Sequence, residues 1–348
     1  MDDAKLARLR EKFSASGGAE ITDPLHQRIA RAQFEGQRRA WPFENPATFL
    51  GAPLVADWAS LPAETRPEIG LVGVPMDLGV TNRAGARLGP RAIRAIERIG
   101  TYNSGLRMAP MLEARVADLG DVPLSSRFSL EACHRDIEAH FTALSQAGIR
   151  TVAAGGDHSM TLAILKALGK ERPLGLVHID AHADTSGAYE GSKFHHGGPF
   201  RQAVLEGVLD PERTIQVGIR GSGGWLWDFS HESGMTLLTM EEVEAMGIPA
   251  VIAKARAVAR GPVYVTFDVD SIDPGLAPGT GTPEVGGFTP REVLALLRGL
   301  VGLDVVSGDA VEVAPQYDAS TATAQIGAQV MFEILCLMVK APSFGTVA

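Results

Sequence analysis

The chain has 348 residues, of which 45% are hydrophobic and 21% charged, an ordinary balance for a globular protein. This length suits one large α/β domain. The net charge of -9 argues against an extended basic surface for nucleic acid. The two cysteines, Cys133 and Cys336, lie in apolar, helix-like segments, so we expect buried free thiols and a reducing compartment.

Neither end of the chain predicts secretion or membrane insertion. The first residues, "MDDAKLARLREKF", are charged and lack the apolar stretch of a secretory signal. The apolar segment "MFEILCLMV" near the other end is too short to span a bilayer and contains Glu333. We therefore expect a cytoplasmic protein.

Residues 1–66 differ from the rest of the chain. They are polar, with helical patches at 6–13 and 26–34, followed by a proline-rich stretch at 41–54. We interpret this segment as an N-terminal arm, which either covers the surface of the domain or contacts another subunit.

From residue 67 to residue 348, apolar runs typical of buried strands alternate with amphipathic segments typical of helices. The predicted strands are 69–76, 149–156, 174–180, 214–220, 262–270 and 305–313. The predicted helices are 89–100, 129–148, 159–169, 239–247, 289–300 and 322–338. This alternation predicts a single α/β domain, in which a parallel sheet carries helices on both faces.

Acidic and imidazole side chains gather where three of these strands end. The segments are "GGDHS" (155–159), "DAHAD" (180–184) and "DVD" (268–270). Sites in open parallel sheets form beyond the carboxyl ends of the strands, and alternate residues of an extended segment face the same side. We therefore expect six side chains to converge: His158, Asp180, His182, Asp184, Asp268 and Asp270.

This set of donors predicts a centre with two metal ions. Carboxylates mixed with imidazoles suit the Mn, Zn, Ni and Fe group of divalent ions better than Ca²⁺. Two divalent ions neutralise four aspartates, whereas one leaves a net negative charge in a buried place. A single "DxD" is often only a turn, and "GGDHS" alone could be a glycine turn followed by a helix cap. Three such clusters after three apolar strands disfavour that interpretation.

The sequence resembles the ureohydrolase family, the arginase and agmatinase group, from residue 67 onward. The resemblance rests on these stretches: "GVPMDLGVTNRAGARLGPRAIR", "GGDHS", "HIDAHAD", "HHGGPF", "FDVDSIDPGLAPGTGTPEVGG" and "VEVAPQYD". It implies an α/β sandwich of three layers around a parallel sheet. It also implies a binuclear manganese site, with nickel in some relatives, and a homo-oligomer, either a trimer or a hexamer.

The resemblance also implies a role for each site residue. One metal ion would be held by His158, Asp180, Asp184 and Asp268, and the other by Asp180, His182, Asp268 and Asp270, so that Asp180 and Asp268 bridge. Asp184 would orient the attacking hydroxide, and Glu312 would receive the guanidinium of the substrate. His196 matches the acid/base histidine, with His195 as its rival for that role. The implied reaction hydrolyses a C–N bond of a guanidino compound to urea and an amine or ammonia.

The substrate itself is less defined. The loop "TSGAYEGSKFH" differs from the loop with which arginases recognise an α-amino acid, and Gly198 stands where the family usually has threonine, so we do not expect arginine. Trp225 and Trp227 are expected to wall the mouth of the site against a cationic tail, although either could be core packing or a subunit contact. Lys193, Arg201 and Arg220 remain candidates to meet a substrate carboxylate.

These features favour an agmatinase-like enzyme that acts on agmatine, guanidine, or an alkylated guanidine or biguanide. The alternative is a guanidino-acid hydrolase of the guanidinobutyrase or guanidinopropionase kind. A subunit of a mixed oligomer with a paralogue is a further alternative. Deacetylases share this fold in outline but use one zinc ion, which the six donors argue against.

Overall fold

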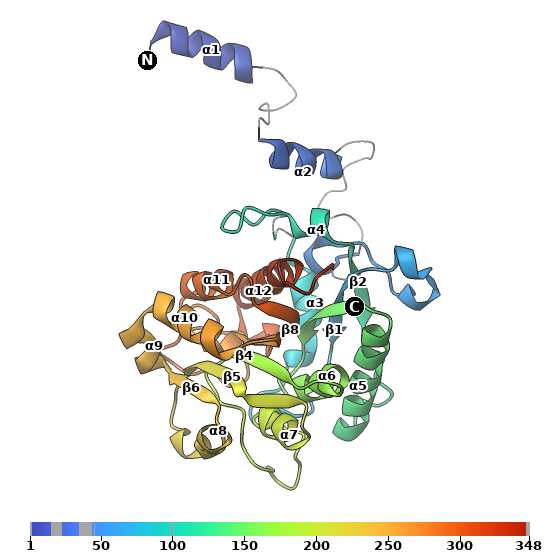
Figure 1. Cartoon of the computed structure of the whole chain (residues 1–348), viewed down its shortest axis with the longest axis vertical. Helices are drawn as coiled ribbons and strands as arrows, with labels where there is room; N and C mark the ends of the chain where they lie inside the picture. The colour runs from blue at the N-terminus through green and yellow to red at the C-terminus, as the bar shows by residue number, and fades with distance from the viewer. Residues whose placement is uncertain are drawn as a thin grey trace.

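An eight-stranded parallel sheet forms the centre of the computed structural model, with the strand order β2-β1-β3-β8-β7-β4-β5-β6 (Figure 1). The structure describes residues 2–14, 23–34, 44, 46–97, 99 and 101–345. The strands are β1 (Ile69–Val74), β2 (Val116–Asp121), β3 (Arg150–Gly155), β4 (Leu174–Ile179), β5 (Leu209–Ile219), β6 (Thr236–Thr239), β7 (Pro262–Asp268) and β8 (Asp304–Val311). All six predicted strands are confirmed. The sequence missed β2 and β6, the two edge strands; three of the four residues of β6 are only partly buried, and β2 ends in an exposed residue.

Helices cover both faces of this sheet, so the predicted three-layer α/β architecture is confirmed (Figure 1). Successive residues of one strand enter different cores: Leu71 packs in one core and Val72 in the other. One face carries α3 (Gly89–Arg94), α9 (Met240–Met246), α10 (Ile248–Val258), α11 (Pro290–Gly299) and α12 (Ala322–Val339). The other carries α5 (Leu130–Gln146), α6 (Met160–Gly169) and α7 (Pro199–Leu205), while α4 (Pro110–Glu113) and α8 (Asp228–Ser233) are short connections.

The helix predictions differ from the structure in two ways. The first predicted helix ends at Arg94 rather than at residue 100. The sequence analysis also missed α4, α7, α8 and α10; Pro199 opens α7, and Pro249 is the second residue of α10. Both cysteines are buried free thiols, as predicted.

Helix α12 is longer than the apolar segment that the sequence suggested. It has 18 residues and is apolar enough to cross a membrane by length and composition alone. However, 72% of that window is buried inside the domain, where the helix packs against β8 and α11. Its Glu333 is buried and accepts hydrogen bonds from Arg298 and Asn103. Within the described residues, α12 is therefore a core helix.

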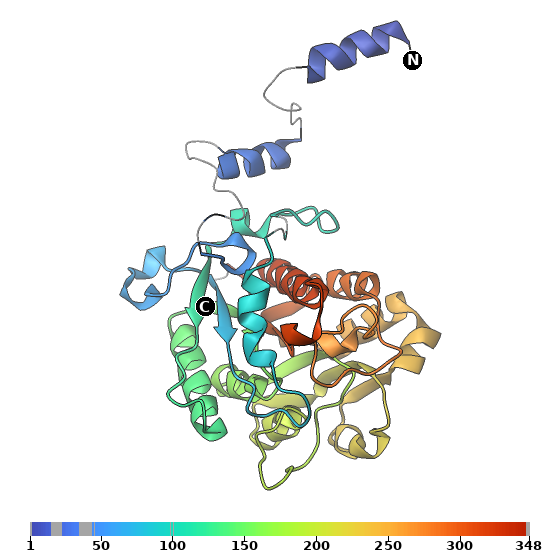
Figure 2. The same ribbon diagram turned by 180° about the vertical axis from the view of Figure 1, so that it is seen from behind.

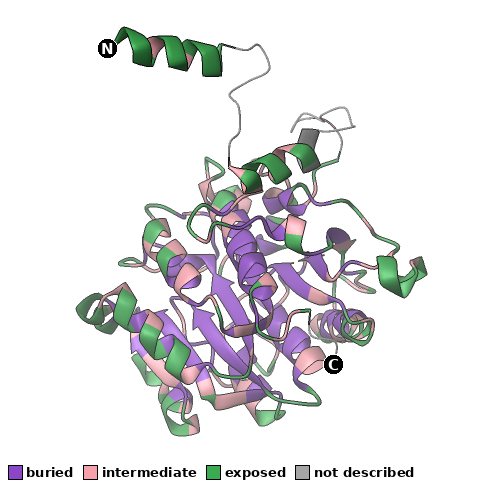
Figure 3. Ribbon diagram, turned by 45° about the horizontal axis from the view of Figure 1, so that its top comes forward, coloured by how far each residue is buried: buried purple, intermediate pink, exposed green. Residues whose placement is uncertain are grey.

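The predicted N-terminal arm divides into two parts. Helix α1 (Asp3–Phe13) has no buried residue and stands apart from the sheet (Figures 2 and 3). Helix α2 (Pro24–Phe34) places the ring of His26 4.8 Å from that of Tyr102. The proline-rich stretch lies partly outside the described residues. Within its described part, Phe49 and Leu50 are buried in the main core. The end of the arm thus packs on the domain, and a boundary at residue 66 remains a prediction.

This packing predicts where the chain tolerates truncation. Phe49 is fully buried, its backbone N–H donates to Asp118, and the guanidinium of Arg94 lies 3.9 Å from the centre of its ring. Deleting residues 1–44 should leave the free energy of unfolding close to that of the full chain. Deleting residues 1–55 removes the Phe49 side chain from the core and should lower it by about 3–5 kcal/mol. Urea denaturation of both truncations measures the difference, and equal midpoints would contradict this role of Phe49.

The order of the strands determines which chain segments share the site. Strands β7 and β8 lie between β3 and β4, so β3, β8, β7 and β4 are neighbours, all parallel. Their carboxyl ends lead directly to four segments: residues 156–159, 312–313, 268–271 and 180–184. The residues that the sequence singled out therefore meet at one edge of the sheet.

Candidate active site

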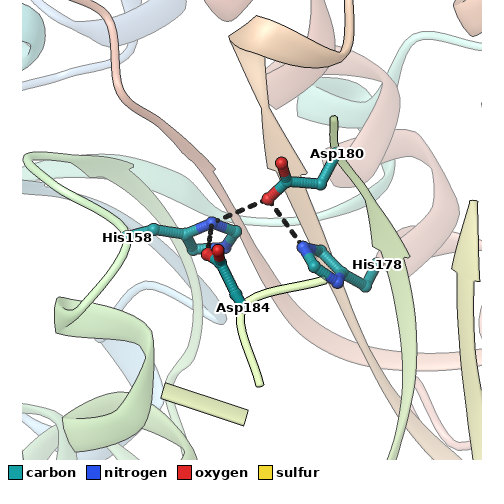
Figure 4. Close-up of side chains that lie close together, drawn as sticks. All are labelled: His158, His178, Asp180 and Asp184. Carbon is teal, nitrogen blue, oxygen red and sulfur yellow. Dashed lines mark hydrogen bonds and ion pairs between the residues drawn. The ribbon is translucent and has the colours of Figure 1, made fainter. Parts of the chain in front are cut away.

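The six predicted metal donors lie together beyond these strand ends, in two groups that share Asp180. In the first group, Nδ1 of His158 is 3.1 Å from Asp180 Oδ2, 3.0 Å from Asp184 Oδ2 and 3.4 Å from Asp268 Oδ2. Figure 4 shows Asp180 and Asp184 both turned toward the ring of His158.

The second group is built around His182. Its Nδ1 lies 3.0 Å from Asp270 Oδ2 and 3.6 Å from Asp180 Oδ1. The shared position of Asp180 fits the bridging role predicted for it. Asp268 is tied to the same segment, because its Oδ1 accepts the backbone N–H of Asp270 at 2.8 Å.

The hydrogen bonds of His158 show that its free nitrogen suits a metal ion. The hydroxyl of Thr266 donates to Asp309, so it accepts from Nε2–H of His158 at 2.8 Å. Nδ1 then carries a lone pair, buried and without a hydrogen-bond partner, among three carboxylates. A lone pair facing anions is repulsive unless a cation lies between them.

The pKa values express the same need for positive charge. Burial alone would lower the pKa of His158, but Asp180, Asp184 and Asp268 raise it well above its usual range. Burial, together with Asp270 and Asp180, raises the pKa of Asp268 well above that of an ordinary carboxyl. Divalent cations would relieve both effects, so the donor set fits metal ions.

His178 is a site residue that the sequence analysis missed. It lies in the first donor group, with Nε2 2.7 Å from Asp180 Oδ2 (Figure 4). The amide of Gln216 donates to Ala183 O and to Nδ1 of His178, so Nε2 carries the proton and donates to Asp180. His178 therefore orients Asp180 as a hydrogen-bond donor. Its alternate spacing with Asp180, His182 and Asp184 was a signal that could have found it.

Glu312 lies beside the donor groups at the end of β8. Its Oε1 accepts from the backbone N–H of His158 and from Nδ1 of His196, both at 2.9 Å. Its Oε2 is buried and has no hydrogen-bond partner. A buried carboxylate oxygen without a donor is costly, so it is placed to receive a cationic ligand such as a guanidinium.

His196, the predicted acid/base group, lies against Glu312. Its Nδ1 donates to Oε1 of Glu312 at 2.9 Å, and its Nε2 lies 2.7 Å from the hydroxyl oxygen of Thr81. Burial lowers the pKa of His196, but the carboxylate of Glu312 outweighs this effect, with Asp184 and Asp157 adding to it, and raises the pKa to about 9. No sequence signal pointed to Thr81, because its contact depends on a fold that joins residues far apart in the chain.

Two of these carboxylates sit on strained backbone. Asp184 and Glu312 have φ values of 51° and 62°, a left-handed region that non-glycine residues rarely adopt. Such strain persists where the surrounding structure holds it, and it is concentrated at functional sites.

A cavity of about 580 Å³ opens beside Asp184 and His196. Trp225 and Trp227 both line it, together with Tyr189 and Glu284. The side chain of Trp225 is 74% exposed, so it belongs to the rim and not to the core. Glu284, which the sequence analysis did not single out, faces His182 across the rim at 3.9 Å.

The three basic candidates for a substrate carboxylate have other partners. All five N–H groups of Arg220 donate to backbone carbonyls, those of Val285, Gly218, Ser271, Asp270 and Glu284. Lys193 pairs with Glu206, and Arg201 donates to Thr185 O, with its guanidinium over the ring of Phe229. Arg220 is the one of the three that lines the cavity, and it acts there as a backbone clamp.

Comparison with known proteins agrees with this geometry. The pattern of the arginase family matches residues 67–337. Guanidinopropionase from Pseudomonas aeruginosa is 47% identical over 303 residues, which cover 86% of this chain and 93% of that protein. Mitochondrial agmatinase from Gallus gallus is 42% identical over 86% of this chain and 92% of its own.

A solved structure supports the same relationship. Proclavaminate amidino hydrolase from Streptomyces clavuligerus superposes with a TM-score of 0.81 at 34% identity, covering 87% of this chain and 100% of that one. The predicted resemblance is confirmed over the whole sheet and every donor segment. The chain belongs to the arginase family and is a metal-dependent ureohydrolase that acts on a guanidino compound.

Proposed function

We propose that the protein hydrolyses a short guanidino acid to urea and the corresponding amino acid. The observation that carries this proposal is the unpartnered Oε2 of Glu312, which offers a buried anion to a guanidinium directly beside the two donor groups. The choice of a substrate with a carboxylate tail is supported by the sequence identities. Guanidinopropionase is 47% identical to this chain, and the agmatinase is 42% identical. This favours the alternative drawn from the sequence over its main interpretation.

The donor groups would hold two divalent ions, for which we propose Mn²⁺ first and Ni²⁺ second. One ion would lie among His158, Asp180, Asp184 and Asp268, and the other among Asp180, His182, Asp268 and Asp270. Such ions, when bound, activate water as a nucleophile near neutral pH.

The chain's own side chains would carry out the remaining steps. Glu312 binds the guanidinium through Oε2 and fixes its carbon for attack. Asp184 accepts a proton from the attacking water, and His196 delivers a proton to the departing nitrogen. Both protons of the water end on the released amine, and the water oxygen becomes the carbonyl oxygen of urea. Because His196 is hydrogen-bonded to Glu312 in the free protein, an entering guanidinium competes with His196 for the Glu312 carboxylate.

A cationic or neutral tail is the second candidate, because one observation favours it. Among the described residues that line the cavity, Arg220 is the only Lys or Arg, and its N–H groups are all occupied. Trp225, Trp227 and Glu284 at the rim would suit a cation, as in agmatine.

A urea-release screen across guanidino compounds, with Mn²⁺ and Ni²⁺ loaded separately, tests the proposal. We expect guanidino acids to rank first. Arginine should have a kcat/KM lower by at least about tenfold, because its α-ammonium lacks a dedicated partner. Agmatine as the best substrate would favour the second candidate, and arginine as the best would contradict both.

We also propose that the chain is catalytic by itself, as a homotrimer or homohexamer. Catalysis without a partner chain is supported by the donor groups, in which no predicted ligand is missing. Light scattering and a urea assay on the isolated chain test it. A chain that binds metal but releases urea only with a paralogous partner would point to the mixed oligomer.

A further inference from the structure

A small opening in the cavity wall lies next to His196, at Gly197. A Cβ added at Gly197 would meet nothing closer than 3.4 Å, which is ordinary van der Waals contact. The atoms around that point include Nδ1 of His195 at 3.4 Å and Oγ of Ser186 at 3.8 Å. The glycine therefore places no side-chain atom beside these two polar groups of the cavity lining.

His195 has one nitrogen without a partner at this opening. Its side chain lines the cavity and is only 7% exposed. Nε2 lies 2.6 Å from the carbonyl oxygen of Gly187, so Nε2 carries a proton and donates. Nδ1 is buried and makes no hydrogen bond. Buried polar atoms are nearly always paired, so this nitrogen is placed for a group that the free protein does not supply.

Gly198 explains why the ring of His195 can occupy this place. A Cβ at Gly198 would lie 3.0 Å from Nε2 of His195 and 3.1 Å from Ser186 O, closer than most side chains tolerate. The φ of Gly198 is -134°, which any residue adopts, so the backbone conformation does not require glycine. Glycine is required here because a Cβ would take the space that the ring of His195 occupies.

The other positive groups of the cavity are occupied. Among the lining residues that the structure describes, Arg220 donates only to backbone carbonyls, His182 faces Asp270 and Glu284, and His196 is bonded to Glu312. His195 is the remaining group of this lining that can carry a positive charge toward a ligand.

We propose that the Gly197 opening binds the carboxylate of the substrate, with Nδ1–H of His195 and the hydroxyl of Ser186 donating to one of its oxygens. His195 is then protonated on both nitrogens, with Nε2 still held by Gly187. Since His195 precedes His196, which contacts Glu312, the carboxylate and guanidinium subsites are adjacent and fit an acid with a short chain. This assignment rests on the proposed function, because it identifies the residues that bind the carboxylate of the proposed guanidino-acid substrate.

The test compares 3-guanidinopropionate with propylguanidine, which has a tail of similar length and no carboxylate. The measured quantity is the ratio of their kcat/KM values. His195→Gln keeps a donor for Gly187 and removes Nδ1, Gly197→Ala fills the opening, and Ser186→Ala removes only a hydroxyl. We expect His195→Gln and Gly197→Ala to lower the ratio by at least about tenfold, mainly through KM, and Ser186→Ala to lower it less.

Ser192→Ala is the matched control for Ser186→Ala. Ser192 lies on the same loop, accepts the N–H of Phe194 and does not line the cavity, so the ratio should not change. A purely structural role of His195 would lower both kcat/KM values equally and leave the ratio constant, which would overturn the proposal. Calorimetric binding of 3-aminopropionate to the metal-loaded enzyme, weakened in Gly197→Ala, gives an independent measurement if His195→Gln does not fold.

The two proposals fail in different ways. A wild-type enzyme that releases no urea from any guanidino acid overturns the proposed function, and this assignment with it. A wild-type enzyme that prefers guanidino acids, with a ratio unchanged in His195→Gln and Gly197→Ala, overturns only the assignment of the carboxylate to the Gly197 opening.

Discussion

Replacing Asp268 by asparagine is expected to lower urea release by at least about a hundredfold, because removing one partner from a buried set of charges costs several kcal/mol. The change is almost isosteric, and an asparagine oxygen can still accept the N–H of Asp270. The expected loss of activity therefore comes from removing the negative charge of Asp268. Asp268 lies 3.4 Å from Nδ1 of His158, so its neutralisation weakens the place where both proposed ions meet.

Elemental analysis should show both metals depleted in Asp268→Asn. The control is Asp273→Asn, the same change five residues along the chain, at a carboxylate that caps the backbone N–H groups of Gly275 and Gly286 outside the donor groups. It should bind metal normally. Two full equivalents of metal in Asp268→Asn, with ordinary turnover, would end the binuclear interpretation.

Glu312→Gln is expected to retain both metals and to lower kcat/KM by about a hundredfold or more, since a charge-assisted pair with the guanidinium is lost. Glutamine can still accept one of the two hydrogen bonds now made by Oε1, so the segment should keep its shape. The metal donors are separate side chains, and their occupancy should not change.

The same variant has a readout independent of turnover. The Glu312 carboxylate is the main group that raises the pKa of His196 to about 9 against the effect of burial. Without that anion the pKa of His196 should fall, which an NMR titration of its ring protons can follow. His196→Asn is the complementary change: it should keep the metals and lower kcat by removing a proton donor. Loss of metal in either variant would contradict these assignments.

The metal donors could be predicted from the sequence because their positions follow from local rules. Asp180, Asp268 and Glu312 each come at the end of an apolar strand, and the ends of parallel strands share one edge. The spacing within "DAHAD" does the rest, since alternate residues face one side. His178 follows the same rule and was missed only because it lies inside the apolar run.

The remaining contacts depend on pairs that no local pattern encodes. The carbonyls bound by Arg220 come from the end of β5, the turn after β7 and residues 284–285, which meet only in the folded chain. An arginine near a site is therefore ambiguous in the sequence: it can bind substrate or clamp backbone. The same holds for Thr81, whose contact with His196 spans 115 residues.

The insertion of β7 and β8 between β3 and β4 has a consequence for how the protein is made. During synthesis, β3 and β4 leave the ribosome well before residues 262–311, which contain β7 and β8. Until then β3 and β4 either stay apart or pair with each other, which is not the native arrangement. While they stay apart, both strands present unpaired edges that invite aggregation. The metal pocket cannot exist earlier, because Asp268, Asp270 and Glu312 arrive with the last two strands. Metal binding at this site therefore requires that the whole sheet has formed. Metal that is present earlier, while the chain is still being synthesised, has no complete site to bind.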